Sequence, residues 1–180
     1  MDGKKKNVFD ASNFRYFLRG VPLEKCFCWG KNIYTPCDGK IIECRDGVNE
    51  RNPTHFVSDM LVVLKNAFFA DLKNLHTILG NHIIMECKEN VYALFAHLKK
   101  ESMNVSVGED IEKGQILGQV GHSGNSTTPH LHFQLMDNCN ILEAKGIPCV
   151  FEKYELYCDN SWKYIYNGIP TNEDRFRFLG

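Results

Sequence analysis

The chain has 180 residues, of which 43% are hydrophobic and 24% are charged, and its formal net charge at pH 7 is -1. This composition is typical of one globular domain of ordinary size, and the small net charge argues against a dedicated nucleic-acid binder, which is usually strongly basic. No apolar run follows the basic residues 1–6, so we expect neither a signal peptide nor a membrane-spanning helix.

The first 44 residues predict a short lead-in element followed by a β-hairpin. Residues 1–20 carry aromatic side chains among polar ones, which indicates a strand or a short helix that packs on the main body. The dipeptide Asp38-Gly39 separates two β-rich runs within residues 26–44 and is typical of a hairpin turn.

Residues 45–79 predict an α-helical insertion. The turn signals Asp46-Gly47 and Asn52-Pro53 open this segment. Apolar residues then recur at roughly helical spacing between Asp59 and Leu79. We expect one or two helices that pack against the edge of a sheet.

Several β-rich runs follow the insertion. The runs 80–87 and 90–98 are separated by a turn, and His97 lies near the end of the second run. Residues 105–118 have a pattern of valine and isoleucine residues separated by glycines, which is typical of the short strands of a β-sandwich and also occurs in lipoyl and biotinyl carrier domains. No lysine has the Met-Lys-Met setting of a carrier, so we expect no attached prosthetic group. Aromatic residues within 154–166 predict a further hairpin.

Residues 121–135, Gly-His-Ser-Gly-Asn-Ser-Thr-Thr-Pro-His-Leu-His-Phe-Gln-Leu, combine a turn-rich loop with an alternating strand. Residues i and i+2 of a strand share a face, so His130 and His132 are expected to point the same way. The opposite, buried face is expected to carry the apolar side chains of Leu131, Phe133 and Leu135. Two imidazoles held side by side next to an open loop form a candidate metal and acid–base site. An isolated His-x-His on a strand is nevertheless common without a metal.

The segment Ser-Gly-Asn-Ser-x-x-Pro-His-Leu-His-Phe, at residues 123–133, resembles the signature of the lysostaphin/LytM-type zinc endopeptidases, which cut peptide cross-links in bacterial cell walls. Residues 30–41 are similar to that family's Gly-x-Pro-Val-x-Ala-x-x-Asp-Gly-x-Val. The runs 80–87 and 90–98 are similar to its Gly-Asn-x-Val and Tyr-x-His-Leu strands. The resemblance covers roughly residues 28–44 and 80–136.

The resemblance implies a mostly β fold of the duplicated hybrid motif type. We expect a twisted antiparallel β-sandwich with a groove and lipoyl-like hairpins, plus the helical insertion. The whole chain, residues 1–180, is expected to form a single LytM-like domain. Within it, residues 45–79 would be the insertion and residues 137–180 a C-terminal aromatic extension.

The resemblance also implies roles for three histidines. His132 corresponds to the family's zinc ligand, and His97 and His130 correspond to its two catalytic histidines, which orient water and stabilise the oxyanion. The family takes its other two protein ligands from an upstream His-x-x-x-Asp, whose positions fall here on Gly20 and Glu24. One histidine and one glutamate are too few for a tight zinc site, which normally has three or four protein ligands.

Three sources of the missing ligands stay open. They are Glu24, Asp10, and the pair His55 and Asp59, which has the His-x-x-x-Asp spacing but lies in the insertion. Both members of that pair would share a helix face and meet one metal. In the competing interpretation, Asp59 caps or begins a helix and His55 lies in a loop.

The remaining histidines have no motif. We expect His122 to be a solvated loop residue, and His76 and His82 to be ordinary surface or half-buried residues. The eight cysteines form no Cys-x-x-Cys, and we expect free, mostly buried thiols in a reducing compartment.

Two functions follow from these observations. The first is a zinc-dependent endopeptidase that hydrolyses cell-wall peptide cross-links. The second is a catalytically inactive module that keeps the groove and binds a peptide, a glycan or a protein partner. The sequence leaves open the oligomeric state and the compartment, which is either cytoplasmic or extracytoplasmic with the leader absent from this chain.

Overall fold

The structure is a computed structural model that describes residues 8–68, 75–171 and 173–178. The chain forms two compact units, Met1–Gly146 and Ile147–Gly180. No helix in the described ranges has the length and apolar character needed to cross a membrane. The single domain expected over residues 1–180 stays a prediction.

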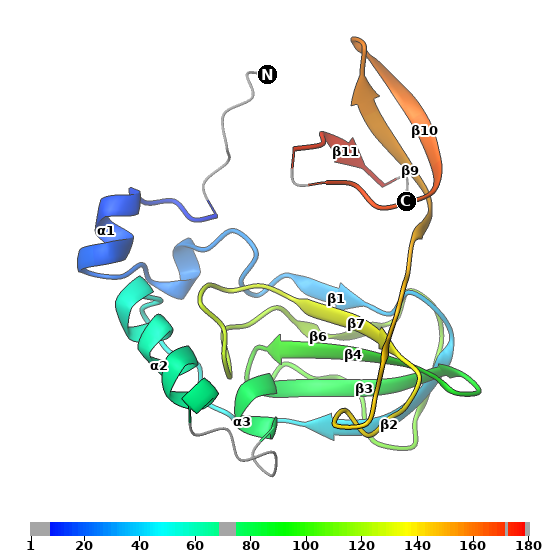
Figure 1. Ribbon diagram of the computed structural model, residues 1–180, viewed down its shortest axis with the longest axis horizontal. Helices are drawn as coiled ribbons and strands as arrows, with labels where there is room; N and C mark the ends of the chain where they lie inside the picture. The colour runs from blue at the N-terminus through cyan, green and yellow to red at the C-terminus, as the bar shows by residue number, and fades with distance from the viewer. Residues whose placement is uncertain (1–7, 69–74, 172, 179–180) are drawn as a thin grey trace. The chain divides into compact units, whose positions relative to one another are not determined.

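The first unit is built on a six-stranded sheet with the order β5-β2-β3-β4-β7-β8 (Figure 1). Its strands are β2 (Gly39–Arg45), β3 (Asn81–Lys88), β4 (Val91–Leu98), β5 (Asp110–Ile111), β7 (His132–Met136) and β8 (Gly146–Ile147), the last of which lies at the boundary between the units. A separate two-stranded antiparallel sheet joins β1 (Asn32–Tyr34) to β6 (Ile116–Gln119). The pairs β2–β3, β2–β5, β3–β4 and β4–β7 are all antiparallel, and the expected mostly β, antiparallel fold is confirmed.

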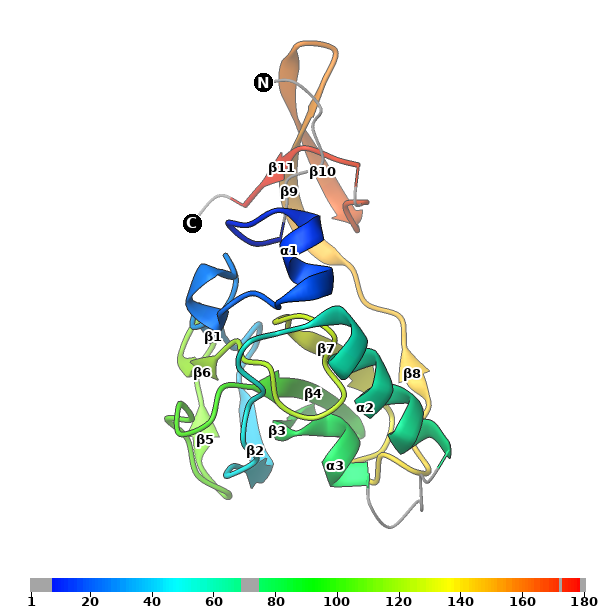
Figure 2. The same ribbon diagram turned by 90° about the vertical axis from the view of Figure 1, so that its left-hand side faces the viewer.

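Helices occupy the N-terminal region and the segment before β3 (Figure 2). They are α1 (Asn13–Leu18), the 3-10 helix η1 (Leu23–Lys25), α2 (Phe56–Phe68) and α3 (Leu75–Leu79). The side chain of Ser12 accepts a hydrogen bond from the Arg15 N–H and so caps α1. Both α2 and α3 lie within the segment 45–79, where helices were expected. Part of the predicted apolar spacing, at 69–74, lies outside the described residues.

Two apolar clusters pack on opposite faces of the large sheet. One lies between the two sheets and joins Ile33 of β1 and Leu117 of β6 to Ile83 and Phe95. The other contains Ile84, Leu94, Met136 and, from α3, Leu79. Because successive strand residues point to opposite faces, the neighbours Ile83 and Ile84 serve different clusters. The histidine-bearing ends of β4 and β7 are therefore fixed to a sheet that is packed on both sides.

The second unit is a three-stranded sheet with the order β10-β9-β11. Its strands are β9 (Phe151–Cys158), β10 (Ser161–Gly168) and β11 (Phe176–Arg177). Asp159 and Asn160 have φ values of 50° and 61°, as a two-residue turn of type I′ requires. The predicted aromatic hairpin is confirmed.

The hairpin predicted at Asp38-Gly39 is wrong. The strand before it, β1, pairs with β6, whereas the strand after it, β2, pairs with β3 and β5. The Asp38 carboxylate accepts a hydrogen bond from the Lys113 N–H at 2.7 Å, so it stabilises a different loop. A Cβ on Gly39 would lie 2.3 Å from the Glu86 carbonyl oxygen, so this glycine permits a close approach between β2 and β3.

We expect the substitution Gly39→Ala to destabilise the first unit by about 1–3 kcal/mol, because the new methyl group would clash with the backbone of Glu86. Urea unfolding measures this. The matched control is Gly146→Ala, whose Cβ would meet nothing nearer than the Gln134 side chain at 3.9 Å. Equal stability of the two variants would contradict the close approach.

Candidate functional site

Three histidines come together where β4 ends and β7 begins. The ring centroid of His97 lies 4.8 Å from that of His130 and 6.0 Å from that of His132. His132 pairs in register with Ala96, the residue before His97, so strand pairing itself sets this proximity. The structure thus gathers all three histidines that the sequence motif singled out.

His97 is buried, and its backbone is in the left-handed region with φ 63°. Burial and the neighbouring His130 lower the pKa of His97 to about 4, although the hydrogen bond to the Ser123 backbone opposes this shift. His97 is therefore neutral at pH 7. Its Nδ1 lies 3.0 Å from the Ser123 carbonyl oxygen, so we assign the ring proton to Nδ1 and the lone pair to Nε2.

His130 and His132 are exposed, in contrast to His97. The Nδ1 of His130 lies 2.7 Å from the Thr128 carbonyl oxygen, which again places the proton on Nδ1 and leaves Nε2 as the acceptor. The Nε2 of His132 lies 3.5 Å from Oε1 of Gln134. The contacts at Nδ1 thus turn Nε2 of both His97 and His130 toward the role of acceptor, beside the exposed ring of His132.

The apolar residues between and after these histidines behave partly as predicted. Leu131 and Leu135 pack against the cluster between the two sheets. Phe133 is 38% exposed, so its predicted burial is wrong. The centroid of its ring lies 5.3 Å from that of Phe95, so the ring packs on the core while part of it stays exposed.

His122 is fully buried, so the prediction of a solvated loop residue is wrong. Its Nδ1 lies 2.9 Å from Oγ of Ser126, and its Nε2 lies 3.2 Å from Oδ2 of Asp59. The same Ser126 oxygen lies 3.2 Å from Nδ1 of His130. A chain of polar contacts therefore runs from the buried Asp59 to the exposed His130.

Asp59 is fully buried and has several partners. Its carboxylate accepts hydrogen bonds from Nε of Arg51 at 2.6 Å, from Oγ1 of Thr54 at 2.9 Å and from the His55 N–H at 2.9 Å. Burial raises the pKa of Asp59, but the hydrogen bonds from His122, Arg51 and His55 outweigh burial and hold the pKa below its usual value. The carboxylate is thus a buried, compensated anion.

The pair His55 and Asp59 serves the start of α2. Besides the bond from the His55 N–H to Asp59, the His55 ring accepts the Ser58 N–H at 3.3 Å. These contacts satisfy backbone donors at a helix N-terminus. The helix α2 begins at Phe56, with Asp59 in its first turn, so the contacts support the interpretation in which Asp59 caps the helix and not the one in which it begins the helix.

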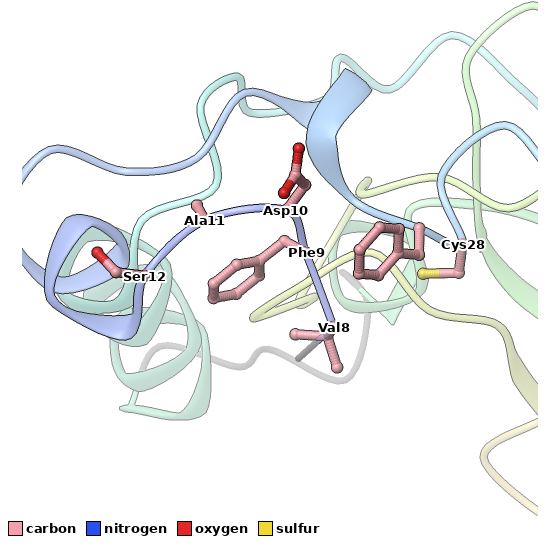
Figure 3. A pocket seen from close by; sticks show the side chains of 7 residues that line it. Val8, Phe9, Asp10, Ala11, Ser12 and Cys28 are labelled. Carbon is pink, nitrogen blue, oxygen red and sulfur yellow. The ribbon is translucent and has the colours of Figure 1, made fainter. Parts of the chain in front are cut away.

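Of the two other ligand candidates, Glu24 is engaged in a hydrogen bond and Asp10 lines a pocket. Glu24 lies in η1 and accepts a hydrogen bond from the Asn52 amide at 3.3 Å. Asp10 lies at an apolar pocket of about 1070 Å³ between Val8 and Cys28, in which the Val8 and Phe9 side chains project away from the Asp10 carboxylate (Figure 3). Cys28 donates to the carbonyl oxygen of Pro129, so this pocket adjoins the loop before His130.

The described residues around His132 do not fit a zinc ion. Within the described ranges, no three ligand atoms that include His132 lie within 4.8 Å of one another. Zinc sites normally have three or four protein ligands. The described residues therefore give His132 no set of partner ligands.

Sequence reasoning missed two contact sets in which histidines take part. His122 meets Asp59 across 63 positions, and His82 meets Glu43 across 39 positions. His82 is also fully buried, which corrects the prediction of a surface or half-buried residue. No local spacing signals such pairs, because folding alone brings these segments together.

The chain belongs to peptidase family M23, whose family model matches residues 25–144. Members of this family are generally zinc-dependent. The chain is 38% identical over 96 residues to glycyl-glycine endopeptidase ALE-1 of Staphylococcus capitis, which covers 52% of this chain and 26% of that protein. It is 52% identical over 79 residues to lysostaphin of Staphylococcus simulans, which covers 43% of this chain and 16% of that protein. The chain thus spans about a quarter or less of these relatives.

Solved structures of the same family are similar to this chain. The catalytic domain of lysostaphin from Staphylococcus simulans has a TM-score of 0.42 at 22% identity, covering 79% of this chain and 87% of that one. The M23 catalytic domain of EnpA from Enterococcus faecalis has a TM-score of 0.44 at 19% identity, covering 71% of this chain and 69% of that one.

Proposed function

We propose that this protein hydrolyses peptide bonds in peptidoglycan cross-links, with His97, His130 and His132 as the site. The observation that carries the proposal is the convergence of these three histidines at the open ends of β4 and β7. Family membership and relatives named as peptidoglycan or glycyl-glycine endopeptidases support this class of substrate.

The chemistry assigned to the chain's own residues is proton transfer. His97 and His130 each have a hydrogen-bonded Nδ1, which leaves Nε2 as the acceptor, and either Nε2 accepts a proton from a water molecule that attacks a peptide carbonyl. The exposed His132 keeps the family's ligand position. Because the described residues supply no full ligand set there, no step is assigned to zinc.

A second candidate is a module that binds cell-wall peptides without cleaving them. The observation that favours it is that two of the alternative ligands already have hydrogen-bond partners: Asp59 has Arg51 and His122, and Glu24 has Asn52. In this case the histidines would recognise the peptide through hydrogen bonds alone.

The test is incubation of the purified chain with intact peptidoglycan, with and without added zinc, and measurement of the new amino groups and released muropeptides. We expect cleavage by the wild type and a loss of about 10²–10⁴-fold in His130→Ala, because a positioned proton acceptor contributes that much. His132→Ala is expected to lose activity as well. Glu112→Gln, a change at an exposed residue outside the site, is the control and should retain it.

Binding to peptidoglycan without any product, weakened by His132→Ala, would favour the second candidate. Neither cleavage nor binding in the wild type would overturn both. Circular dichroism of each variant separates loss of activity from loss of the fold.

A further inference from the structure

A second group of histidines lies on the same sheet, outside the three histidines described above. The ligand atoms of Glu43 in β2, His82 in β3 and His76 in α3 all lie within 4.8 Å of one another. Strands β2 and β3 are neighbours, and α3 directly precedes β3 and lies beside its start (Figures 1 and 2). We propose that these three side chains bind a divalent cation of the zinc type.

The first argument is the tautomer of His82, that is, which of its ring nitrogens carries the proton. Its Nδ1 lies 2.7 Å from the Gly80 carbonyl oxygen, so Nδ1 carries the ring proton. Its Nε2 faces Oε1 of Glu43 at 3.2 Å. In this tautomer, a lone pair on Nε2 of His82 faces a lone pair on Oε1 of Glu43, and the two repel each other. A cation that binds both atoms would remove this repulsion.

His76 supplies a third donor. Its Nδ1 is buried, lies 3.8 Å from the same Glu43 oxygen and has no hydrogen-bond partner among the described residues. The rings of His76 and His82 are stacked, with centroids 5.6 Å apart and planes within 5°. A buried nitrogen without a partner costs free energy, and coordination would remove that cost.

The chemistry of the donors selects the ion. Two imidazole nitrogens and one carboxylate oxygen form a donor set typical of zinc, with the fourth position left for water. The Nδ1–H of His82 donates to the Gly80 carbonyl oxygen. Zinc-bound histidines usually donate their second ring N–H to such an acceptor. The side chains of His76 and Glu43 are 41% and 30% exposed, so an ion has access from solvent.

Arg45 competes with the cation. Its Nε donates to Oε1 of Glu43 at 2.7 Å, and its side chain is largely exposed. A bound dication would repel the guanidinium, so Arg45 must move aside, and its charge lowers the affinity. Substitution of a ligand and substitution of Arg45 are therefore expected to have opposite effects on cation binding.

The cation would link the short helix α3 to β2 and β3. It uses none of the residues of the proposed function, since those lie on β4, on β7 and in the loop between residues 121 and 131. Zinc binding here and hydrolysis of peptidoglycan are thus separate properties that fail or succeed independently.

The test is titration of the chelator-treated chain with zinc against a competing indicator, together with the thermal midpoint. We expect His76→Ala to weaken zinc binding at least about tenfold, since even loss of an outer partner costs 10–100-fold. Glu43→Gln, which keeps the side-chain volume, should do the same, and Arg45→Gln should tighten binding. Zinc should raise the thermal midpoint of the wild type and not that of His76→Ala.

The matched control is His132→Ala, which removes a histidine of the other group and should leave this binding event unchanged. Zinc binding that is lost in His132→Ala and kept in both His76→Ala and Glu43→Gln would overturn the proposal. So would a wild type that binds no zinc at millimolar concentration.

Discussion

Replacement of Asp59 by alanine is expected to lower the free energy of unfolding by about 3–5 kcal/mol, because it removes the fully buried carboxylate that compensates the partly buried Arg51. Arg51 would keep its bonds to the carbonyl oxygens of Gly124 and Ser126 but lose its anion. The fully buried His122 would lose its partner at Nε2. Urea unfolding at pH 7 measures the effect.

An exposed carboxylate gives the control for this result. Glu101 forms a surface ion pair with Lys100 at 3.6 Å, and Glu101→Gln is expected to change stability by less than about 1 kcal/mol. The double variant Arg51→Met with Asp59→Ala should cost less than the sum of the two single changes, because their charges compensate each other. Additive costs, or a small effect of Asp59→Ala, would show that the buried contacts do not hold the loop that carries His130.

Acidification of the metal-free protein from pH 6.5 to pH 4 is expected to remove about 3 kcal/mol of stability through His97 alone. The ring titrates near pH 6.5 in the unfolded chain and at about 4 in the fold, where burial and His130 lower its pKa. Above pH 6.5 both states are neutral and the residue contributes no pH dependence. Between the two pKa values only the unfolded state binds the proton, so stability falls by about 1.4 kcal/mol per pH unit.

The measurement is the free energy of unfolding at several pH values for the wild type and for His97→Asn. Asparagine tolerates the left-handed backbone at this position and does not titrate. The variant should be less pH-dependent over this window, whatever its stability at pH 7. Parallel slopes for the two proteins would mean that His97 binds its proton equally well in both states, and would contradict the lowered pKa of His97 in the fold.

The candidate site was predicted from sequence where its signal is local. The alternation around Leu131 places His130 and His132 on one side, and the β-run that ends near His97 predicts a second histidine-bearing strand. Register then joins the two, because Ala96 pairs with His132. The exposure of Phe133 was not predicted, because alternation shows on which face of a strand a residue lies but not whether other residues cover that face.

In the sequence by itself, periodicity indicated the β-runs and the helical segment before β3, because strand and helix periodicities are properties of neighbouring residues. The trio His97, His130 and His132 was indicated by the resemblance of residues 123–133 and 90–98 to family motifs. The tertiary structure decided which charged groups meet. Asp59 pairs with His122, and Glu43 faces His82, across 63 and 39 positions. Such contacts depend on how strands pair and helices pack. A buried charge without a partner costs free energy, so a buried charged group needs a partner, and the fold decides which residue that partner is.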